Sequence, residues 1–180
     1  MTVCMKLPRT LRLDPSDRFV FDRAAEPGEW AVSGAFVFHG EAEPATHKAR
    51  VALRSGFLGI DSLGWSTLVE VTEASAAEYA AAEAMLAARL RTHFGAPDAA
   101  AAQAAAREEL AFAASLCDLP AGTVVAVHRL WSDGGITERF RTLTRRADRA
   151  APVFAPVFAL VESDEAAEAV DLRHLPGGVP

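Results

Sequence analysis

The segment Thr123–Thr144, TVVAVHRLWSDGGITERFRTLT, holds the strongest turn signal of the chain between two runs of alternating side chains. Asp-Gly at its centre favours a two-residue turn, so the segment predicts a β-hairpin with strands over 123–131 and 136–144. A turn at Asp133-Gly134 pairs Arg129 with Glu138, whereas a turn at Gly134-Gly135 slips the register by one residue. Hairpins of this kind indicate a mainly antiparallel sheet.

The two faces of the hairpin differ in chemistry. One is an apolar core face with an Arg129–Glu138 pair expected near its rim; it carries Val125, Val127, Trp131, Ile136 and Phe140. The other carries His128, Arg139 and Arg141, two planar guanidiniums beside an imidazole that titrates near neutral pH. We predict these three residues as candidates for binding a carboxylate or phosphate in a groove under the Ala-rich helices. The alternative is a solvated face whose partners are the carboxylates of the C-terminal tail.

Further strands are expected over 6–14, 17–23, 30–39, 65–73 and 152–161. Phe19 and Phe21 alternate with polar neighbours, which is the period of a half-buried strand. The turn Asp14-Pro-Ser-Asp17 separates the first two strands, and together the first three predict a β-meander. Pro156 lacks a backbone donor and therefore makes 152–161 an edge or bulged strand.

Helices are expected over 44–55, 75–94 and 98–117. Ser75 and Glu78 form a capping box, and Asp98 supplies the next N-cap. Alanine has high helix propensity and dominates 74–114, which predicts an antiparallel helix pair packed on the sheet. We therefore expect one α+β domain over 1–180, with about six to seven strands and frayed ends at 1–4 and 173–180.

Composition excludes several classes of protein. The chain has 180 residues and a net charge of −6 at pH 7, which argues against binding of nucleic acid. No stretch reaches the roughly 18 apolar residues of a membrane helix, and the N-terminus lacks the apolar region of a secretory signal. Two cysteines, Cys4 and Cys117, are too few for a disulfide framework. These features predict a cytoplasmic protein with reduced thiols and no membrane partner.

Sequence motifs for catalysis and metal binding are absent. The chain contains no GxGxxG, GxxxxGK[ST], GxSxG or HExxH pattern, and its five histidines are dispersed. Glu70, Glu138 and Glu162 lie within expected strands as acid–base candidates, but a solvated or salt-paired carboxylate is the favoured interpretation of each. We therefore expect no cofactor and no metal, and no catalytic residue can be assigned.

The first third of the chain resembles a family of uncharacterised bacterial proteins of about this length. The resemblance runs over residues 5–67 and rests on Leu7–Asp14, Phe19–Phe21 and, above all, Glu26–Phe36, EPGEWAVSGAF. Gly56-Phe-Leu-Gly59 and Trp65-Ser-Thr67 continue it. The resemblance implies a domain of unknown function and carries no residue role over to this chain.

Taken together, the sequence predicts a non-enzymatic accessory or interaction protein of the bacterial cytoplasm that forms a homodimer. The dimer would use the edge strand at 152–161 or an Ala-rich helix face. The alternative is a protein or enzyme that binds a small anionic metabolite at His128, Arg139 and Arg141. A deep pocket would favour ligand binding, and a flat apolar patch would favour a protein partner.

Overall fold

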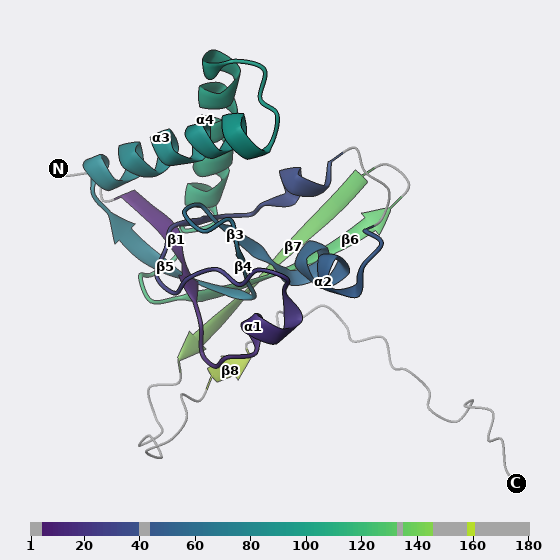
Figure 1. Ribbon diagram of the computed structural model, residues 1–180. Helices are drawn as coiled ribbons and strands as arrows, with labels where there is room; N and C mark the ends of the chain where they lie inside the picture. Colours follow the sequence, from purple (N-terminus) through teal and green to yellow (C-terminus); the bar gives the residue numbers. More distant parts are fainter. Residues whose placement is uncertain (1–4, 40–43, 133–134, 146–157, 161–180) are drawn as a thin grey trace, which may run out of the picture.

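The computed structural model describes residues 5–39, 44–132, 135–145 and 158–160, and shows an α+β fold with two sheets (Figure 1). The main sheet has five strands in the order β1-β5-β6-β7-β8, and the small sheet has three in the order β2-β3-β4. Every pairing between these strands is antiparallel. The α+β class and the antiparallel sheet are confirmed.

The elements have the following bounds. The main sheet consists of β1 (Met5–Leu11), β5 (Leu68–Ala74), β6 (Val124–Ser132), β7 (Gly135–Arg145) and β8 (Phe158–Leu160). The small sheet consists of β2 (Ala31–Val32), β3 (Phe57–Gly59) and β4 (Trp65–Ser66). The helices are α1 (Asp17–Val20), the 3₁₀ turn η1 (Ala35–Phe38), α2 (His47–Ser55), α3 (Ala76–His93) and α4 (Ala99–Ser115).

The central hairpin has the register that a two-residue turn predicts. Trp131 lies opposite Ile136, Arg129 opposite Glu138, and His128 opposite Arg139. The alternation of side chains then sends Arg129 and His128 to opposite faces. The first of the two registers considered from the sequence is therefore confirmed.

The two long helices begin where the sequence predicts. The Ser75 side chain accepts from the Glu78 backbone N–H, Glu78 accepts from that of Ser75, and Asp98 caps α4 through Ala101. Figure 1 shows α4 crossing α3 rather than running alongside it, and buried alanines such as Ala82, with small side chains, line the helix cluster. Over the described ranges, no helix combines the length and apolarity needed to cross a membrane.

The strand predicted over 17–23 is wrong. Asp17–Val20 forms the single helical turn α1, where Phe19 is 73% exposed while Phe21 is 1% exposed. The buried Asp17 carboxylate accepts from the Thr67 backbone N–H at 3.3 Å and from its hydroxyl at 2.9 Å. This long-range contact ties the segment to the start of β5 and overrides the local alternation of aromatic residues.

The strand predicted over 30–39 and the N-terminal meander are also wrong. Only Ala31–Val32 is a strand, because Gly34 turns the chain with a φ of +78° and η1 follows. A Cβ at Gly34 would lie 2.7 Å from the Leu58 Cβ, so glycine is required both for its φ and for close approach. β1 forms its ladder with the distant β5, and its contact with the segment before β2 is an isolated bridge between Arg9 and Trp30. In the strand predicted over 152–161, only 158–160 lies within the described residues, and the ends at 1–4 and 173–180 lie outside them.

Among the described residues, the core consists of three clusters. The helix cluster joins α3 and α4 to β1 and the small sheet through residues such as Leu7, Leu86 and Leu110. A second cluster, on the apolar hairpin face, joins Val125 and Val127 to Cys117 and the small sheet. The third joins α2 to Phe21 and Phe38. The small sheet therefore contributes to the two clusters that contain most of the buried side chains.

Ala106 provides a test of the close helix packing. It is fully buried in the helix cluster, so Ala106→Leu forces extra volume into a filled space and should destabilise the protein by about 1–3 kcal/mol. Ala104→Leu, on the exposed side of the same helix, should change stability by less than about 0.5 kcal/mol. Urea unfolding of both variants measures the difference, and equal stabilities would contradict this packing.

Candidate functional site

Arg129 is the most enclosed charged residue described, with a side chain that is fully buried. Its Nε donates to Glu138 at 2.7 Å, and its Nη1 donates to the carbonyls of Gly56 at 2.6 Å and Leu53 at 3.2 Å. Its Nη2 donates to the carbonyl of Ser33 and, at 3.1 Å, to its hydroxyl. The Arg129–Glu138 pair was expected near a rim; it is instead an interior contact that joins β6 and β7 to α2 and the small sheet.

Two carboxylates, those of Glu138 and Glu109, interact with the positive charge of Arg129. Glu138 accepts from the Ser33 hydroxyl as well as from Arg129, whereas Glu109 approaches from α4. Burial, together with the negative charge of Glu138, raises the pKa of Glu109 to about 7, despite the opposing effect of Arg129. Glu109 therefore titrates near neutral pH inside the fold.

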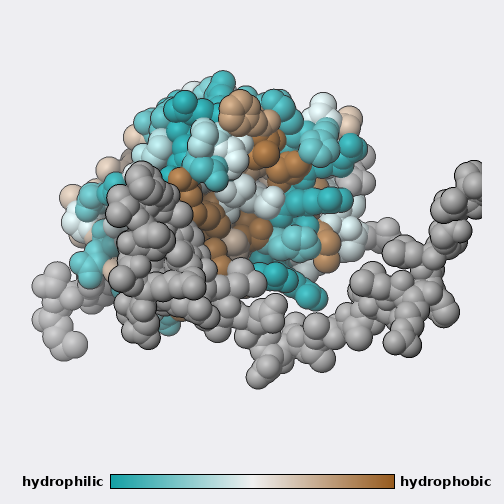
Figure 2. All heavy atoms as spheres, turned by 90° about the horizontal axis from the view of Figure 1, so that it is seen from below, coloured by the Kyte–Doolittle hydropathy of each residue, from teal (hydrophilic) through white to brown (hydrophobic). Residues whose placement is uncertain are grey.

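The three candidates for an anion site lie on the open face of the hairpin. His128, Arg139 and Arg141 are all exposed and alternate with the residues of the core face. The groove predicted there under the Ala-rich helices is wrong: α4 packs on the opposite face, where the rings of Phe112 and Phe140 lie 5.9 Å apart. Figure 2 views the molecule from below and shows apolar patches interspersed with hydrophilic side chains.

The other residues considered from the sequence are the acid–base candidates and the cysteines. Among the described residues there is no cluster of three or more His, Cys, Asp or Glu side chains that could hold a metal ion. Burial raises the pKa of the Cys117 thiol to about 12, which is typical of an unreactive core cysteine. Glu138 is in the Arg129 network and Glu70 lies in β5, while Glu162 lies outside the described residues.

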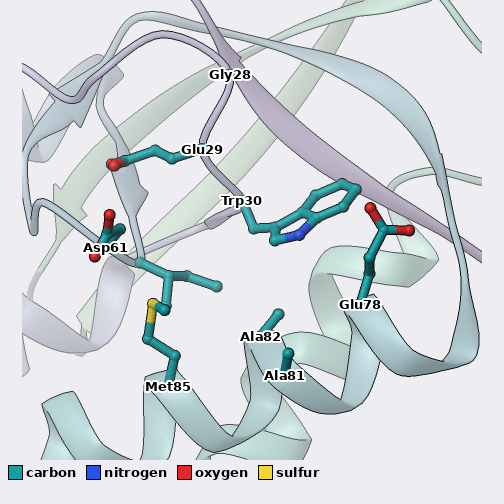
Figure 3. A pocket seen from close by; sticks show the side chains of 9 residues that line it. Gly28, Glu29, Trp30, Asp61, Glu78, Ala81, Ala82 and Met85 are labelled. Atoms are coloured by element: carbon teal, nitrogen blue, oxygen red, sulfur yellow. The ribbon is translucent and has the colours of Figure 1, made fainter.

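A cavity of about 300 Å³ lies between the small sheet and α3, at the lower end of the range for ligand sites. Figure 3 shows Trp30 facing Ala81 and Ala82 of α3, with the carboxylates of Glu29 and Asp61 together at the end away from Glu78. The cavity, here called the Trp30 cavity, is lined by Gly28, Glu29, Trp30, Ile60, Asp61, Glu78, Ala81, Ala82 and Met85.

Backbone hydrogen bonds hold the sheet-side wall of the Trp30 cavity. Thr10 of β1 exchanges bonds with the loop before β2: its N–H donates to the Glu29 carbonyl, and its carbonyl accepts from Gly28, both at 2.9 Å. The Ile60 N–H donates to the Trp30 carbonyl at 2.9 Å. Trp30 and Ile60 are therefore placed by a rigid framework, as a preformed binding site requires.

Glu29 is half-buried at one end of the cavity. Its carboxylate accepts from the Ser62 hydroxyl at 2.6 Å and from the Ser62 N–H at 3.1 Å. Desolvation raises its pKa above the ordinary value, the Ser62 bonds oppose that shift, and the charges of Asp61 and Glu26 add to it. A Cβ at Gly59 would overlap the Glu29 carboxylate, so glycine makes room for it there.

The other two carboxylates of the cavity have arginine partners. Arg89 donates to Asp61 at 3.2 Å, and Arg9 donates to Glu78 at 3.4 Å. The Arg9 guanidinium also stacks on Trp30, with its Cζ 3.7 Å from the ring centroid. Among the described residues, the ion pairs do not include Glu29.

The lining of the Trp30 cavity suits binding. Its middle is apolar, and its polar groups are carboxylates at the two ends. Among the lining residues that the structure describes, there is no serine, cysteine, histidine or lysine. The cavity can therefore enclose the apolar part of a small molecule, and its carboxylates can orient a polar or charged part of the same molecule.

The sequence did not identify this cavity. The sequence predicts Trp30 only as part of a strand and Glu78 only as part of a helix cap, and it contains Glu29 only within the motif Glu26–Phe36. The one available signal was the motif Glu26–Phe36, which carries the strongest part of the family resemblance. Nothing in the spacing connects it to α3, about 50 residues later.

Comparison with known proteins gives one match. The sequence profile described as "Family of unknown function (DUF6505)" matches residues 5–156. No curated protein and no solved structure matches the chain.

The raised pKa of Glu109 predicts a loss of stability with rising pH. Glu109 binds its proton more tightly in the folded state, where the pKa is about 7, than in the unfolded state, where it is near 4.5. Its contribution is therefore favourable below pH 4.5 and is lost as the pH rises through 7. After allowance for solvent screening, Glu109→Gln should raise stability at pH 8 by about 1–2 kcal/mol relative to its effect at pH 4.5.

Urea unfolding at pH 4.5, 6 and 8 measures this change. Glu108→Gln is the matched control, because Glu108 precedes Glu109 in α4 but is exposed. Identical pH profiles for the two variants would show that Glu109 does not titrate in this way.

Proposed function

This chain belongs to a family of unknown function, DUF6505, and we propose that it is a non-enzymatic binding protein whose Trp30 cavity holds a small molecule with an apolar body. The observation that supports this proposal is the cavity of about 300 Å³ between the small sheet and α3. Ligand sites commonly combine such an apolar enclosure with a few charged groups that set orientation.

The chemistry of the cavity favours binding over catalysis. The groups that could orient a ligand are the carboxylates of Glu29, Asp61 and Glu78, and each already accepts hydrogen bonds from its own surroundings. A general base would need an acceptor aimed at a reacting proton with a nucleophile close by. Among the described lining residues, these carboxylates have no serine, cysteine, histidine or lysine beside them.

We further propose that the protein acts as an accessory component of the cytoplasm and as a homodimer. The acidic net charge of −6 and the two cysteines, of which Cys117 is buried and unreactive, agree with a cytoplasmic protein. Two parts of the predicted dimer surface fall within the described residues: an Ala-rich helix face, where Phe112 of α4 is 39% exposed, and β8, which is an edge strand of the main sheet.

Binding of a neutral aromatic probe tests the cavity. A compound of the size of 2-phenylethanol should bind with a Kd of roughly a millimolar, as expected of a fragment with so few atoms. Titration followed by ¹H–¹⁵N NMR should shift the amides of Trp30, Ile60 and Ala82. Ala81→Phe places a ring at the mouth of the cavity and should abolish these shifts.

The matched control is Ala80→Phe. Ala80 is the preceding exposed residue of α3 and does not line the cavity, so this variant should bind as the wild type does. Binding that survives Ala81→Phe would show that the probe occupies another place.

A second candidate function is binding of a small anion on the open hairpin face. The register supports it, because His128 lies directly opposite Arg139 and all three candidate side chains are exposed on one face. Arginine offers a planar fork of donors that matches a carboxylate or phosphate. Because α4 packs on the opposite face, such a site would lie on the surface of the hairpin.

Inorganic phosphate tests this candidate. Removing both guanidiniums in Arg139→Ala/Arg141→Ala should weaken phosphate binding at least about tenfold, the scale of one charged hydrogen bond, while helix content by circular dichroism stays constant. Arg107→Ala removes an exposed arginine of α4 and serves as the control. Phosphate shifts that persist in the double variant would rule the candidate out.

A further inference from the structure

We propose that the ligand of the Trp30 cavity carries a single positive charge, an amine or guanidinium on an apolar body, and that Glu29 is its counter-ion. This inference rests on the proposed function, because it names the chemical class of ligand that the same cavity takes. It follows from the distribution of charge around the cavity and from the position of Glu29 relative to the apolar wall.

Among the described residues, the ion pairs around the cavity leave one carboxylate without a cation. The ion pair between Arg89 and Asp61 and the ion pair between Arg9 and Glu78 each neutralise one acidic group. Glu29 accepts only from the neutral donors of Ser62 in the hydrogen bonds described for it. With two guanidiniums to three carboxylates, the cavity has a local charge of −1 when all groups are ionised.

Glu29 is also the carboxylate for which a cation would matter most. Glu29 is half-buried. Desolvation disfavours its ionised form and so raises its pKa above the ordinary value. Asp61 and Glu78 lie on more exposed side chains. An ammonium group bound beside Glu29 would replace lost hydration with a charge-assisted hydrogen bond, the stronger kind of such bonds.

The geometry separates the place for the charge from the place for the apolar body. Figure 3 shows the carboxylates of Glu29 and Asp61 at the end of the cavity away from the indole ring of Trp30. The middle is formed by that ring, by Met85 and by the alanines of α3. A ligand that places its charge beside Glu29 can therefore extend its apolar part along Trp30 toward Glu78.

Trp30 acts as an apolar wall for such a ligand. The Arg9 guanidinium already stacks on the Trp30 ring and forms a cation–π interaction with it. A second cation over the same ring would be repelled by Arg9. The positive group of the ligand is thus directed to Glu29, and an anionic group is disfavoured at both ends because each end already carries a carboxylate.

Three probes of similar shape test the charge preference in the wild-type chain. At pH 7.5, 2-phenylethylamine is a cation, 2-phenylethanol is neutral and 3-phenylpropionate is an anion. Titrations followed by ¹H–¹⁵N NMR should show the amine binding at least about tenfold more tightly than the alcohol, and the anion more weakly than either. This comparison requires no variant to fold.

Glu29→Gln then identifies the counter-ion. It keeps the shape of the side chain and an acceptor for Ser62, so the affinity for the alcohol should stay within about twofold of wild type, while the advantage of the amine falls below about threefold. Glu26→Gln is the matched control: Glu26 is exposed, close enough to Glu29 to influence its charge, and outside the cavity lining. This variant should keep most of the preference for the amine.

The outcomes separate the two proposals. Equal affinities for amine and alcohol would overturn the cationic class and leave the binding cavity in place. A preference for the amine that persists in Glu29→Gln would overturn the role of Glu29. Amine binding that survives Ala81→Phe would place the cation elsewhere and overturn the inference, and a lack of binding by all three probes at 10 mM would overturn both the inference and the proposed function.

Discussion

The fully buried guanidinium of Arg129 is the constraint on which the rest of the structure depends. A charge with five donors cannot leave water unless a counter-ion and several acceptors surround it. Glu138 supplies the counter-ion from the neighbouring strand, and the remaining acceptors come from Ser33, Leu53 and Gly56. Removing one partner from such a pair leaves an uncompensated charge, which is far more costly than the pair itself.

These acceptors lie in segments that must meet at one place. The backbone of Ser33 follows β2, and Gly56 both caps α2 and precedes β3. Arg129 therefore joins the hairpin of the main sheet to the small sheet and to the end of α2. Trp30 directly precedes β2 and Ile60 directly follows β3, so two wall residues of the Trp30 cavity are attached to strands that the buried guanidinium helps to hold in place.

The described part of the molecule separates two kinds of charge. Carboxylates gather at the Trp30 cavity, where two of the three have arginine partners, and cations gather on the open face of the hairpin. Glu109 and Glu138 form a third group around Arg129, inside the fold. The net charge of −6 predicts none of these local groups of charges, because each group depends on which side chains folding brings together.

The sequence by itself determined the elements whose signals are local. The capping box at Ser75, the N-cap at Asp98 and the Asp-Gly turn each act within a few residues, and all three predicted their elements correctly. The tertiary structure alone decided the rest. Thr67 holds Asp17 in a helical turn where aromatic alternation predicted a strand, and α3 completes a cavity with residues about 50 positions earlier in the chain. Arg129 shows the same limit, since the hairpin predicted its partner Glu138 but not its burial, which requires acceptors from two distant segments, at Ser33 and at the end of α2.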